Sequence, residues 1–496
     1  MNHEINRLLN FGLQKHLINE EDFDYCANLL IDLLGLDEFV YEKIDERLEE
    51  CTPILENILD EVCKQGIIEN NITQRDLFDT RIMNCLMMRP SEVIQRFNHL
   101  YEVEGPQAAT DDYYQLSIAS NYIRLSRVEK NMKWITPSKY GNMQISINLS
   151  KPEKDPKEIE KAKLVKSSDY PKCLLCKENV GYSGDLKKNA RQTHRIIPIQ
   201  LDGHSYYLQY SPYVYYNEHC IVLNKDHVPM SINPHTFSSL LAFLDILPHY
   251  FIGSNADLPI VGGSILSHDH FQGGRHHFPI ENAKVLETYC FKDFPHVKVE
   301  MVEWPLSTLR LTSINKTELL KLSEHILNTW KNYSDETVDI ISHTQDGAHN
   351  TITPISRMVN NAYQLDLVLR NNRCNEKYPN GIFHPHQDVH HIKKENIGLI
   401  EVMGLAILPA RLKDEMIYIK EALLQEKSLD EKILGTHFDW VKEIMHKHTY
   451  TKENIDALLQ DEIGQVFVRV LEDAGVFKLD QKGIEAFKRF VSCLGL

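Results

Sequence analysis

The chain has 496 residues, of which 42% are hydrophobic and 25% are charged, and its formal net charge is −16 at pH 7. This composition is typical of globular proteins, and the length predicts about three domains. The acidic balance disfavours nucleic acid as a partner, although a small anionic substrate needs only a few local cations or backbone amides.

The sequence contains no signal for membrane insertion or export. No apolar run approaches the roughly 18 residues that a membrane span needs. The N-terminus, "MNHEINRLLNFGLQKHL", is amphipathic and lacks the apolar region and cleavage site of a signal peptide. We therefore expect a cytoplasmic protein without membrane contacts, in which the ten cysteines are free thiols or metal ligands.

Residues 1 to about 100 are predicted to be helical, as in "EDFDYCANLLIDLLGLDEF", where apolar residues recur at helical spacing. A block rich in Tyr, Ile and Val follows, with strands expected in "DYYQLSIASNYIRLS", "MQISINLS", "HSYYLQYSPYVYYNEHCIVLN" and "GGSILSHDHF". Within it, "KPEKDPKEIEKAK", from Lys151, is typical of a charged loop or an exposed helix start. The segment "NPHTFSSLLAFLDILPHYF" is predicted to begin as a helix capped by its Asn-Pro.

A second strand-helix-strand pattern runs from about residue 299 to 410. It contains "VKVEMVEWPLSTLRLTS", then helical "KTELLKLSEHILNTWKNYS", then strands in "AYQLDLVLRN" and "IGLIEVMGLAILPARL". From Leu412 the pattern is helical again, as in "KDEMIYIKEALLQEKSLDEKIL" and "GIEAFKRFVSCLGL". This order predicts an α+β fold with two similar units flanked by helical segments.

The stretch "SHDHFQ" places His268, His270 and Gln272 at strict alternation, so a strand would present all three on one face. An imidazole can attack phosphorus when its other nitrogen is held by a hydrogen bond. Gln272 can donate a hydrogen bond to a phosphoryl oxygen but cannot act as an acid, which suits a good leaving group such as a sugar phosphate. A pair of structural histidines beside a glycine-rich turn is the alternative interpretation.

The close pair Cys173 and Cys176 in "PKCLLCKEN" supplies half of a tetrahedral zinc site. His227 in "LNKDHVPM" and His268 are candidates for the other ligands, because both are expected at ends or turns of the strand-rich block. Partly buried thiols and a surface histidine would explain the same pattern, so both interpretations stay open.

The motifs of other nucleotide-binding and hydrolytic enzymes are missing. The sequence has no G-x-x-x-x-G-K-[ST], no G-x-G-x-x-G between a strand and a helix, no G-x-S-x-G and no H-E-x-x-H. These missing motifs leave histidine-based phosphoryl transfer as the favoured chemistry.

Three long segments carry a family resemblance: "HRIIPIQLDGHSYYLQYSPYVYYNEHCIVLNKDHVPM", "PHYFIGSNADLPIVGGSILSHDHFQGG" and "HPHQDVHHIKKENIGLIEVMGLAILPARL". They strongly resemble the second, bacterial-type class of galactose-1-phosphate uridylyltransferases, which belong to the histidine-triad superfamily. The resemblance implies two histidine-triad-like units with antiparallel sheets, at 106–298 and 299–411, between helical segments at 1–105 and 412–496.

The resemblance also implies an activity. Enzymes of this family exchange UMP between UDP-glucose and galactose 1-phosphate by a ping-pong mechanism through a uridylyl-histidine, as part of galactose metabolism. UDP-glucose, UDP-galactose and hexose 1-phosphates are the implied small-molecule partners, a homodimer is the implied assembly, and no organic cofactor is expected.

Catalytic and metal-binding roles transfer residue by residue. The active strand of the first class reads H-P-H-G-Q, and "HDHFQ" is similar, which makes His270 the nucleophile and Gln272 the residue that stabilises the intermediate. In that class the first histidine of the motif binds zinc with a C-x-x-C and a further histidine. The implied ligands of a structural zinc are Cys173, Cys176, His227 and His268.

The first class has a second metal on an H-x-H strand of its second unit. The corresponding stretch here, "YQLDLVLRN", has Asp366 and Val368 at those positions, so we expect no second metal. His384 and His386 in "FHPHQDVHH" follow that strand, so metal ligation is not transferred to them. They either bind substrate or lie on a loop, and we predict the loop.

Phosphate groups need cations, and several candidates follow from weaker similarities. An early basic segment of the first class resembles "SNYIRLSRVEKNMKW", "NARQTHRI" offers rival arginines, and a late lysine of that class contacts the sugar phosphate. Two polar residues before the Gly-Gly turn are placed to meet ribose or phosphate. The candidate substrate-binding residues are Arg124, Arg127, Lys130, Arg191, Arg195, Lys394, Asn255 and Asp257.

Two alternative functions remain. A nucleotide hydrolase or phosphorylase of the same superfamily would act on dinucleoside polyphosphates, but a third histidine in place of Gln272 would favour hydrolysis, and the glutamine argues against it. A non-catalytic, zinc-stabilised nucleotide-binding protein would bind a uridine nucleotide without exchange and without a covalent adduct.

Overall fold

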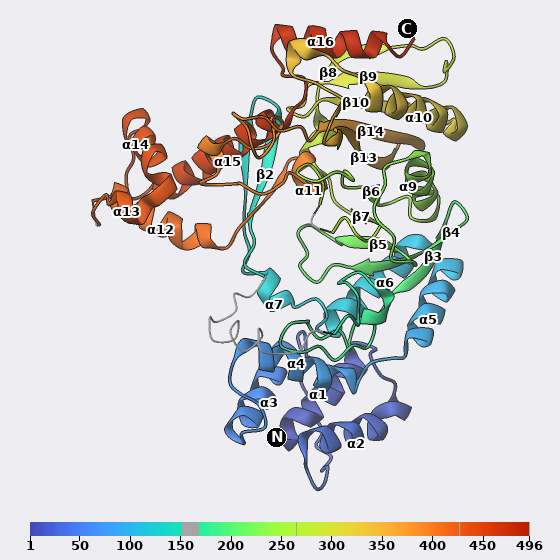
Figure 1. The fold of residues 1–496 in the computed structure, drawn as a ribbon. Coiled ribbons are helices and arrows are strands. Elements are labelled where there is room, and N and C mark those ends of the chain that lie inside the picture. Colours follow the sequence, from blue (N-terminus) through green and yellow to red (C-terminus); the bar gives the residue numbers. More distant parts are fainter. Residues whose placement is uncertain (151–167, 264, 426, 496) are drawn as a thin grey trace.

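The computed structural model describes residues 1–150, 168–263, 265–425 and 427–495 (Figure 1). The charged segment predicted from Lys151 therefore lies outside the described residues. Among the described residues, no helix combines the length and the apolar character needed to cross a membrane.

The N-terminal part of the chain is helical, as predicted. In the first helix, Ile5, Leu8 and Leu9 are buried at helical spacing and form part of a core among the neighbouring helices. The helices are α1 (Asn2–Gln14), α2 (Phe23–Leu34), α3 (Thr52–Lys64), α4 (Ile72–Asn84), α5 (Pro90–Val103), α6 (Pro106–Ala119) and α7 (Leu125–Val128).

The strand predicted around "DYYQLSIASNYIRLS" is wrong, because most of this segment belongs to α6. Pro106 at the first helical position starts the helix. The buried residues Ala109, Tyr113 and Leu116 recur every three to four positions, which is the helical period. Tyrosine and isoleucine are common in strands, but here the spacing of the buried side chains decides the element.

A ten-stranded, wholly antiparallel sheet forms the centre of the molecule, which confirms the α+β prediction. Its order is β3-β4-β5-β7-β6-β13-β14-β10-β9-β8. Read from the outer edge to the centre, the first half is β3-β4-β5-β7-β6 and the second is β8-β9-β10-β14-β13. In both halves the last strand in the sequence lies fourth and the strand before it lies at the centre. The strands are β3 (Ile197–Leu201), β4 (His204–Tyr210), β5 (Cys220–Asn224), β6 (Phe251–Gly253), β7 (His270–Gly274), β8 (Val285–Tyr289), β9 (Lys298–Val302), β10 (Thr308–Ser313), β13 (Asn350–Val359) and β14 (Ala362–Asn371).

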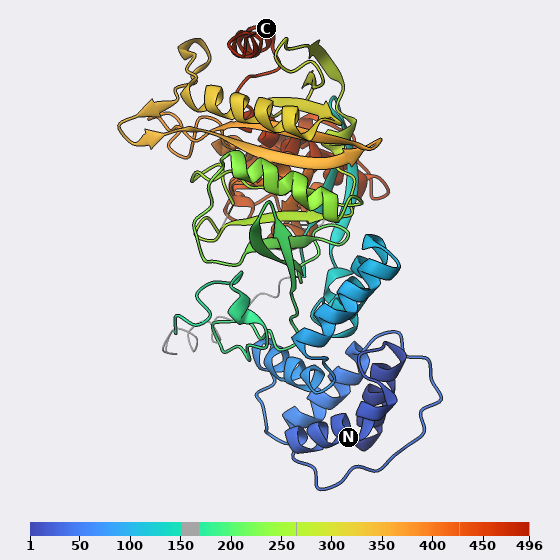
Figure 2. The same ribbon diagram turned by 90° about the vertical axis from the view of Figure 1, so that its right-hand side faces the viewer.

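Two helices, α9 (Pro234–Ile246) and α10 (Lys316–Asn332), lie side by side on one face of this sheet (Figure 2). The Asn233 side chain caps α9 by accepting hydrogen bonds from two backbone N–H groups, which confirms the predicted Asn-Pro start. Phe237 of α9 and Phe271 of β7 belong to the same buried core. The two helices therefore cover much of this face of the sheet, and a cavity of about 220 Å³ lies beside the start of α9.

The other face carries a second core, in which Phe251 and Ile355 of the large sheet meet C-terminal helices. A small sheet, β1 (Met132–Ser138), β2 (Gly141–Ile147) and β15 (Leu405–Leu408), lies on this side. The strand predicted in "IGLIEVMGLAILPARL" begins instead as a helical turn, and only its second part is β15. The remaining elements are α11 (Leu399–Val402), α12 (Arg411–Leu423), α13 (Glu431–Leu434), α14 (Phe438–Lys447), α15 (Ile455–Ala474), α16 (Gln481–Ser492) and the hairpin of β11 (His343–Thr344) and β12 (Gly347–Ala348).

Candidate active site

Strand β7 carries His270 and Gln272. It starts at His270, so His268 lies in the bend before the strand and not on it, in contrast to the prediction. Phe271, between the two, points into the core shared with α9. Alternation therefore directs His270 and Gln272 to the opposite face of the sheet.

A hydrogen bond fixes the tautomer of His270. Its Nδ1 lies 2.7 Å from the backbone carbonyl oxygen of His268, which can only accept, so Nδ1 carries the proton and Nε2 keeps a free lone pair. Burial lowers the pKa of His270 below its ordinary value, and the hydrogen bond offsets only part of that shift. The ring is therefore neutral at pH 7, with Nε2 in the state that a nucleophile requires.

A pocket of about 630 Å³ opens on this face of the sheet. Its floor consists of side chains from three adjacent strands: Gln209 of β4, Ile221 of β5, and His270 and Gln272 of β7. Other walls come from the segment 393–407, which contains α11 and part of β15. Its volume lies in the ordinary range of small-molecule sites.

Four potential metal ligands converge beside the start of β7, and their sulfur and nitrogen atoms all lie within 4.8 Å of one another. The two thiol sulfurs of Cys173 and Cys176 are 3.4 Å apart. Cys173 Sγ is 3.2 Å from His268 Nδ1, and Cys176 Sγ is 3.2 Å from His227 Nδ1. Ligands bound tetrahedrally to zinc lie about 3.5 Å from one another. The donor set and its spacing therefore fit a metal ion.

Backbone carbonyl groups hold this cluster in place. The Asn179 side-chain amide donates to the carbonyl oxygens of both cysteines, at 2.8 and 2.7 Å. His268 Nε2 lies 2.8 Å from the Asn224 carbonyl oxygen, which orients the ring and leaves Nδ1 for the cluster. Because the His268 carbonyl oxygen also accepts the hydrogen bond from His270 Nδ1, His268 connects the cluster to the candidate nucleophile.

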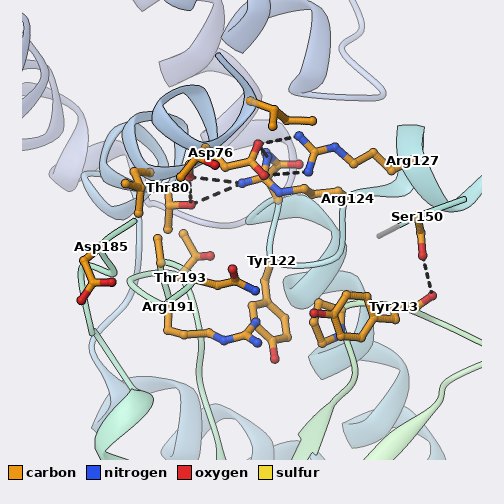
Figure 3. A pocket seen from close by; sticks show the side chains of 17 residues that line it. Asp76, Thr80, Tyr122, Arg124, Arg127, Ser150, Asp185, Arg191, Thr193 and Tyr213 are labelled. Carbon is orange, nitrogen blue, oxygen red and sulfur yellow. Dashed lines mark hydrogen bonds and ion pairs between the residues drawn. The ribbon is translucent and has the colours of Figure 1, made fainter. Parts of the chain in front are cut away.

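The predicted cations Arg124 and Arg127 lie in a neighbouring, smaller cavity of about 150 Å³ (Figure 3). Both guanidinium groups are already paired with carboxylates of α4. Arg124 Nη2 is 2.8 Å from Asp79 Oδ1, and Arg127 Nη1 is 2.8 Å from Asp76 Oδ2. These pairs connect α4 to the start of α7.

Arg191 is differently placed, because it lines both the smaller cavity and the pocket in front of His270. Its guanidinium carbon lies 5.6 Å from the centroid of the Tyr122 ring (Figure 3). Within the described part of the chain, no ion pair joins it to a carboxylate. Of the predicted arginines, Arg191 is the one that the pocket places within reach of a ligand of His270.

Three other predicted cations do not line this pocket. Arg195 is buried and donates to the backbone carbonyl oxygens of Met88, Gln192 and His194, at 2.8 to 2.9 Å. The Lys130 and Lys394 side chains are exposed.

The lysine beside Lys394 does line the pocket. Lys393 is buried, and its Nζ lies 2.9 Å from Glu401 Oε1 and 3.1 Å from the Ile407 carbonyl oxygen. Sequence reasoning missed both Lys393 and Glu401. The adjacent "KK" was the available signal for the lysine, but it did not indicate which of the two points inward.

Asn255 lies at the pocket and Asp257 does not. The Asn255 Oδ1 accepts the Leu399 backbone N–H at 2.8 Å, which ties the end of β6 to α11. Asp257 instead accepts the Ile232 backbone N–H at 2.8 Å and the Thr351 hydroxyl at 2.5 Å. Its carboxylate therefore stabilises the loop that follows β6.

In the second half of the sheet, β14 has the place that β7 has in the first. Asp366 on this strand is fully buried and accepts hydrogen bonds from Arg310, at 2.7 and 2.9 Å, and from Arg357, at 2.7 Å. Burial alone would raise the pKa of Asp366, but the two guanidinium groups lower it below its ordinary value. The predicted loop position of His384 and His386 is confirmed.

Comparison with known families agrees with this geometry. The family model "Galactose-1-phosphate uridyl transferase, N-terminal domain" matches residues 17–229, and the model of the C-terminal domain matches residues 244–442. The chain belongs to the galactose-1-phosphate uridyl transferase family. The expected family membership is thereby confirmed.

Relatives in this family match over their whole length. A galactose-1-phosphate uridylyltransferase of Clostridium acetobutylicum is 56% identical, covering 100% of both chains. Those of Caldanaerobacter subterraneus and Bacillus subtilis are 51% and 48% identical, each covering 99% of this chain and 97% of the relative. Among solved structures, the yeast Ap4A phosphorylase Apa2 matches with a TM-score of 0.33 and 10% identity, over 68% of this chain and 93% of that one.

Proposed function

We propose that this family member is a nucleotidyltransferase of galactose metabolism that exchanges UMP between UDP-glucose and galactose 1-phosphate. The observation that carries the proposal is the state of His270: its Nδ1 is held by a carbonyl oxygen, and its Nε2 lies on the pocket face of β7 without a hydrogen-bond partner among the described residues. The names of relatives at 48 to 56% identity indicate uridylyl transfer to galactose 1-phosphate, and UDP-glucose as the donor follows from the family resemblance.

The reaction proceeds in two displacements at the same phosphorus. The Nε2 lone pair of His270 attacks the α-phosphorus of UDP-glucose, the bond to the bridging oxygen breaks, and glucose 1-phosphate leaves with the electron pair. Galactose 1-phosphate then attacks the phosphorus of the uridylyl-histidine and restores the neutral imidazole. Neither leaving group needs a proton, so Gln272 serves by donating to the phosphoryl oxygen.

The pocket supplies cations for the substrate phosphates. Arg191 and Lys393 both line it, although they come from distant segments of the chain. We propose that they contact phosphate oxygens. The Asn255 Oδ1 accepts a backbone N–H, and in the part of the chain that the structure describes its amide N–H groups donate to no other residue, so we propose that they bind a ligand.

The neighbouring lysines Lys393 and Lys394 offer a matched pair of substitutions. Lys393→Met is expected to reduce kcat/KM by about 10- to 100-fold, because it removes a charge-assisted hydrogen bond to phosphate and also the ion-pair partner of Glu401. Lys394→Met, at an exposed position, is expected to change kcat/KM less than about twofold. Steady-state kinetics with a thermal melt of each variant would test this, and equal effects of the two substitutions would contradict the assignment.

Other features follow from the family. We propose that Cys173, Cys176, His227 and His268 hold a structural zinc, which fixes the bend before β7 and supplies no reacting group. A homodimer in the cytoplasm, with no nucleic acid or membrane partner, is the assembly that we propose from the same resemblance. The acidic net charge of −16 supports the exclusion of nucleic acid.

We also propose the domain division 1–105, 106–298, 299–411 and 412–496. The repeated strand order of the large sheet supports two units. β8 lies within 106–298 in the sequence, but it pairs with β9 and belongs to the second half of the sheet.

Intact-protein mass spectrometry tests the function directly. The protein is incubated with UDP-glucose and no acceptor, and we expect a mass gain of one uridylyl group that maps to His270. Adding galactose 1-phosphate should remove it and produce UDP-galactose. Release of free UMP without acceptor would indicate a hydrolase, and nucleotide binding without any adduct would indicate a binding protein.

A further inference from the structure

The Gln272 side chain ends in two groups with opposite hydrogen-bonding character, an NH₂ group and a carbonyl oxygen. Its N–H groups would stabilise negative charge on a phosphoryl oxygen, whereas its carbonyl oxygen would repel that charge. The side chain is only half-buried, and rotation about its last bond exchanges the two groups. The proposed reaction therefore needs something that holds the carbonyl oxygen away from the phosphate.

His219 makes the contact that decides this orientation. It is buried at the residue before β5, the strand that pairs with β7, and its Nε2 lies 3.2 Å from Gln272 Oε1. If Nε2 carries the proton, it donates to Oε1 and turns the amide N–H groups of Gln272 toward the pocket. The tautomer of His219 thus determines which face of Gln272 the substrate meets.

The surroundings of His219 favour that tautomer. Its Nδ1 is buried and has no hydrogen-bond partner among the described residues. A proton on Nδ1 would leave a buried donor unsatisfied, which is rarer and costlier than an unsatisfied acceptor. Burial lowers the pKa of His219 to about 4, so the ring is neutral at pH 7 and has one proton to place.

Aromatic packing holds the ring in this position. The His219 ring stacks on Tyr215, with centroids 5.4 Å apart, and contacts Tyr216, with centroids 4.5 Å apart. The Tyr216 hydroxyl in turn donates to the Gly273 carbonyl oxygen at 3.1 Å, one residue after Gln272. The His219 ring and the Gln272 amide are therefore both held at neighbouring residues of β7.

We infer that His219 is a positioning residue, which donates from Nε2 to Gln272 Oε1 and so presents the Gln272 amide N–H groups to the transferred phosphoryl group. This inference rests on the proposed uridylyl transfer. His219 itself touches no reacting atom, and its effect passes through Gln272.

Two variants separate the effect of the His219 N–H donor from the effect of its ring packing. His219→Phe keeps an aromatic ring between the tyrosines but removes the donor, and we expect uridylylation of His270 to slow by about 100-fold, comparable to the loss of one well-placed donor. His219→Gln restores an N–H near the position of the imidazole Nε2, and should recover most of the rate. Affinity for UDP and the thermal midpoint should stay near those of the wild type in both.

A double-mutant cycle with Gln272→Ala tests the route of the effect. If His219 acts through Gln272, adding His219→Phe to Gln272→Ala should slow the adduct-forming step no further. A double variant slowed by the product of the two single effects, or a His219→Phe variant at the wild-type rate, would overturn the inference. A wild-type protein that forms no uridylyl adduct would overturn the proposed function, and this inference with it.

Discussion

His270→Ala is expected to reduce uridylyl transfer by about 10⁴-fold or more and to abolish the covalent adduct, because the substitution removes the only proposed nucleophile. Gln272 has no group that can replace it, since an amide nitrogen is not nucleophilic. The pocket and its other polar residues would remain, so the variant should still bind UDP-glucose. The prediction therefore separates loss of chemistry from loss of binding.

The measurement combines turnover, adduct mass and nucleotide affinity for wild type and variant. His386→Ala is a suitable control, because this histidine lies in a loop, stacked on Tyr378 at 4.1 Å between ring centroids, and not in the pocket. It should transfer UMP at close to the wild-type rate. A His270→Ala protein that still forms the adduct would mean that another residue is the nucleophile.

Much of the fold follows from local patterns in the sequence. The predicted strand "AYQLDLVLRN" coincides with β14, and the Asn-Pro start of α9 is capped as expected. The misassigned segment, α6, shows the limit of such patterns, since tyrosine and isoleucine fit a buried helix face as well as a strand. How the two halves join is also not local: the β6–β13 contact pairs Gly253 with Ile355, about a hundred residues apart.

The residues of the candidate site also fall into two groups, those that sequence patterns predict and those that only the fold reveals. Histidine and cysteine spacing nominated the metal ligands, which the fold brings together from three separate segments. By contrast, Lys393 and Lys394 are equivalent by composition, and only the path of the chain after β14 turns one inward and the other outward. His219 was missed because its importance depends on the pairing of β5 with β7, which places it beside Gln272.

The cysteine–histidine cluster bears directly on the orientation of His270. A zinc ion bound there would fix His268 by its Nδ1, while the carbonyl oxygen of His268 holds the Nδ1 proton of His270. Displacement of the His268 bend would release His270 to other tautomers and positions. We therefore expect the metal to matter for the rate, although it takes no part in bond making.

Cys173→Ser is the substitution that tests this coupling. We expect about one zinc per wild-type chain by elemental analysis and little in the variant, because serine is a poor ligand for zinc. Transfer should fall by about 100-fold and the thermal midpoint by more than about 5 °C, since metal binding contributes folding free energy. Cys374→Ser, at an exposed and free cysteine, should change none of these quantities. If zinc is lost but the rate is kept, the bend before β7 holds His270 without the metal, and the ion serves stability alone.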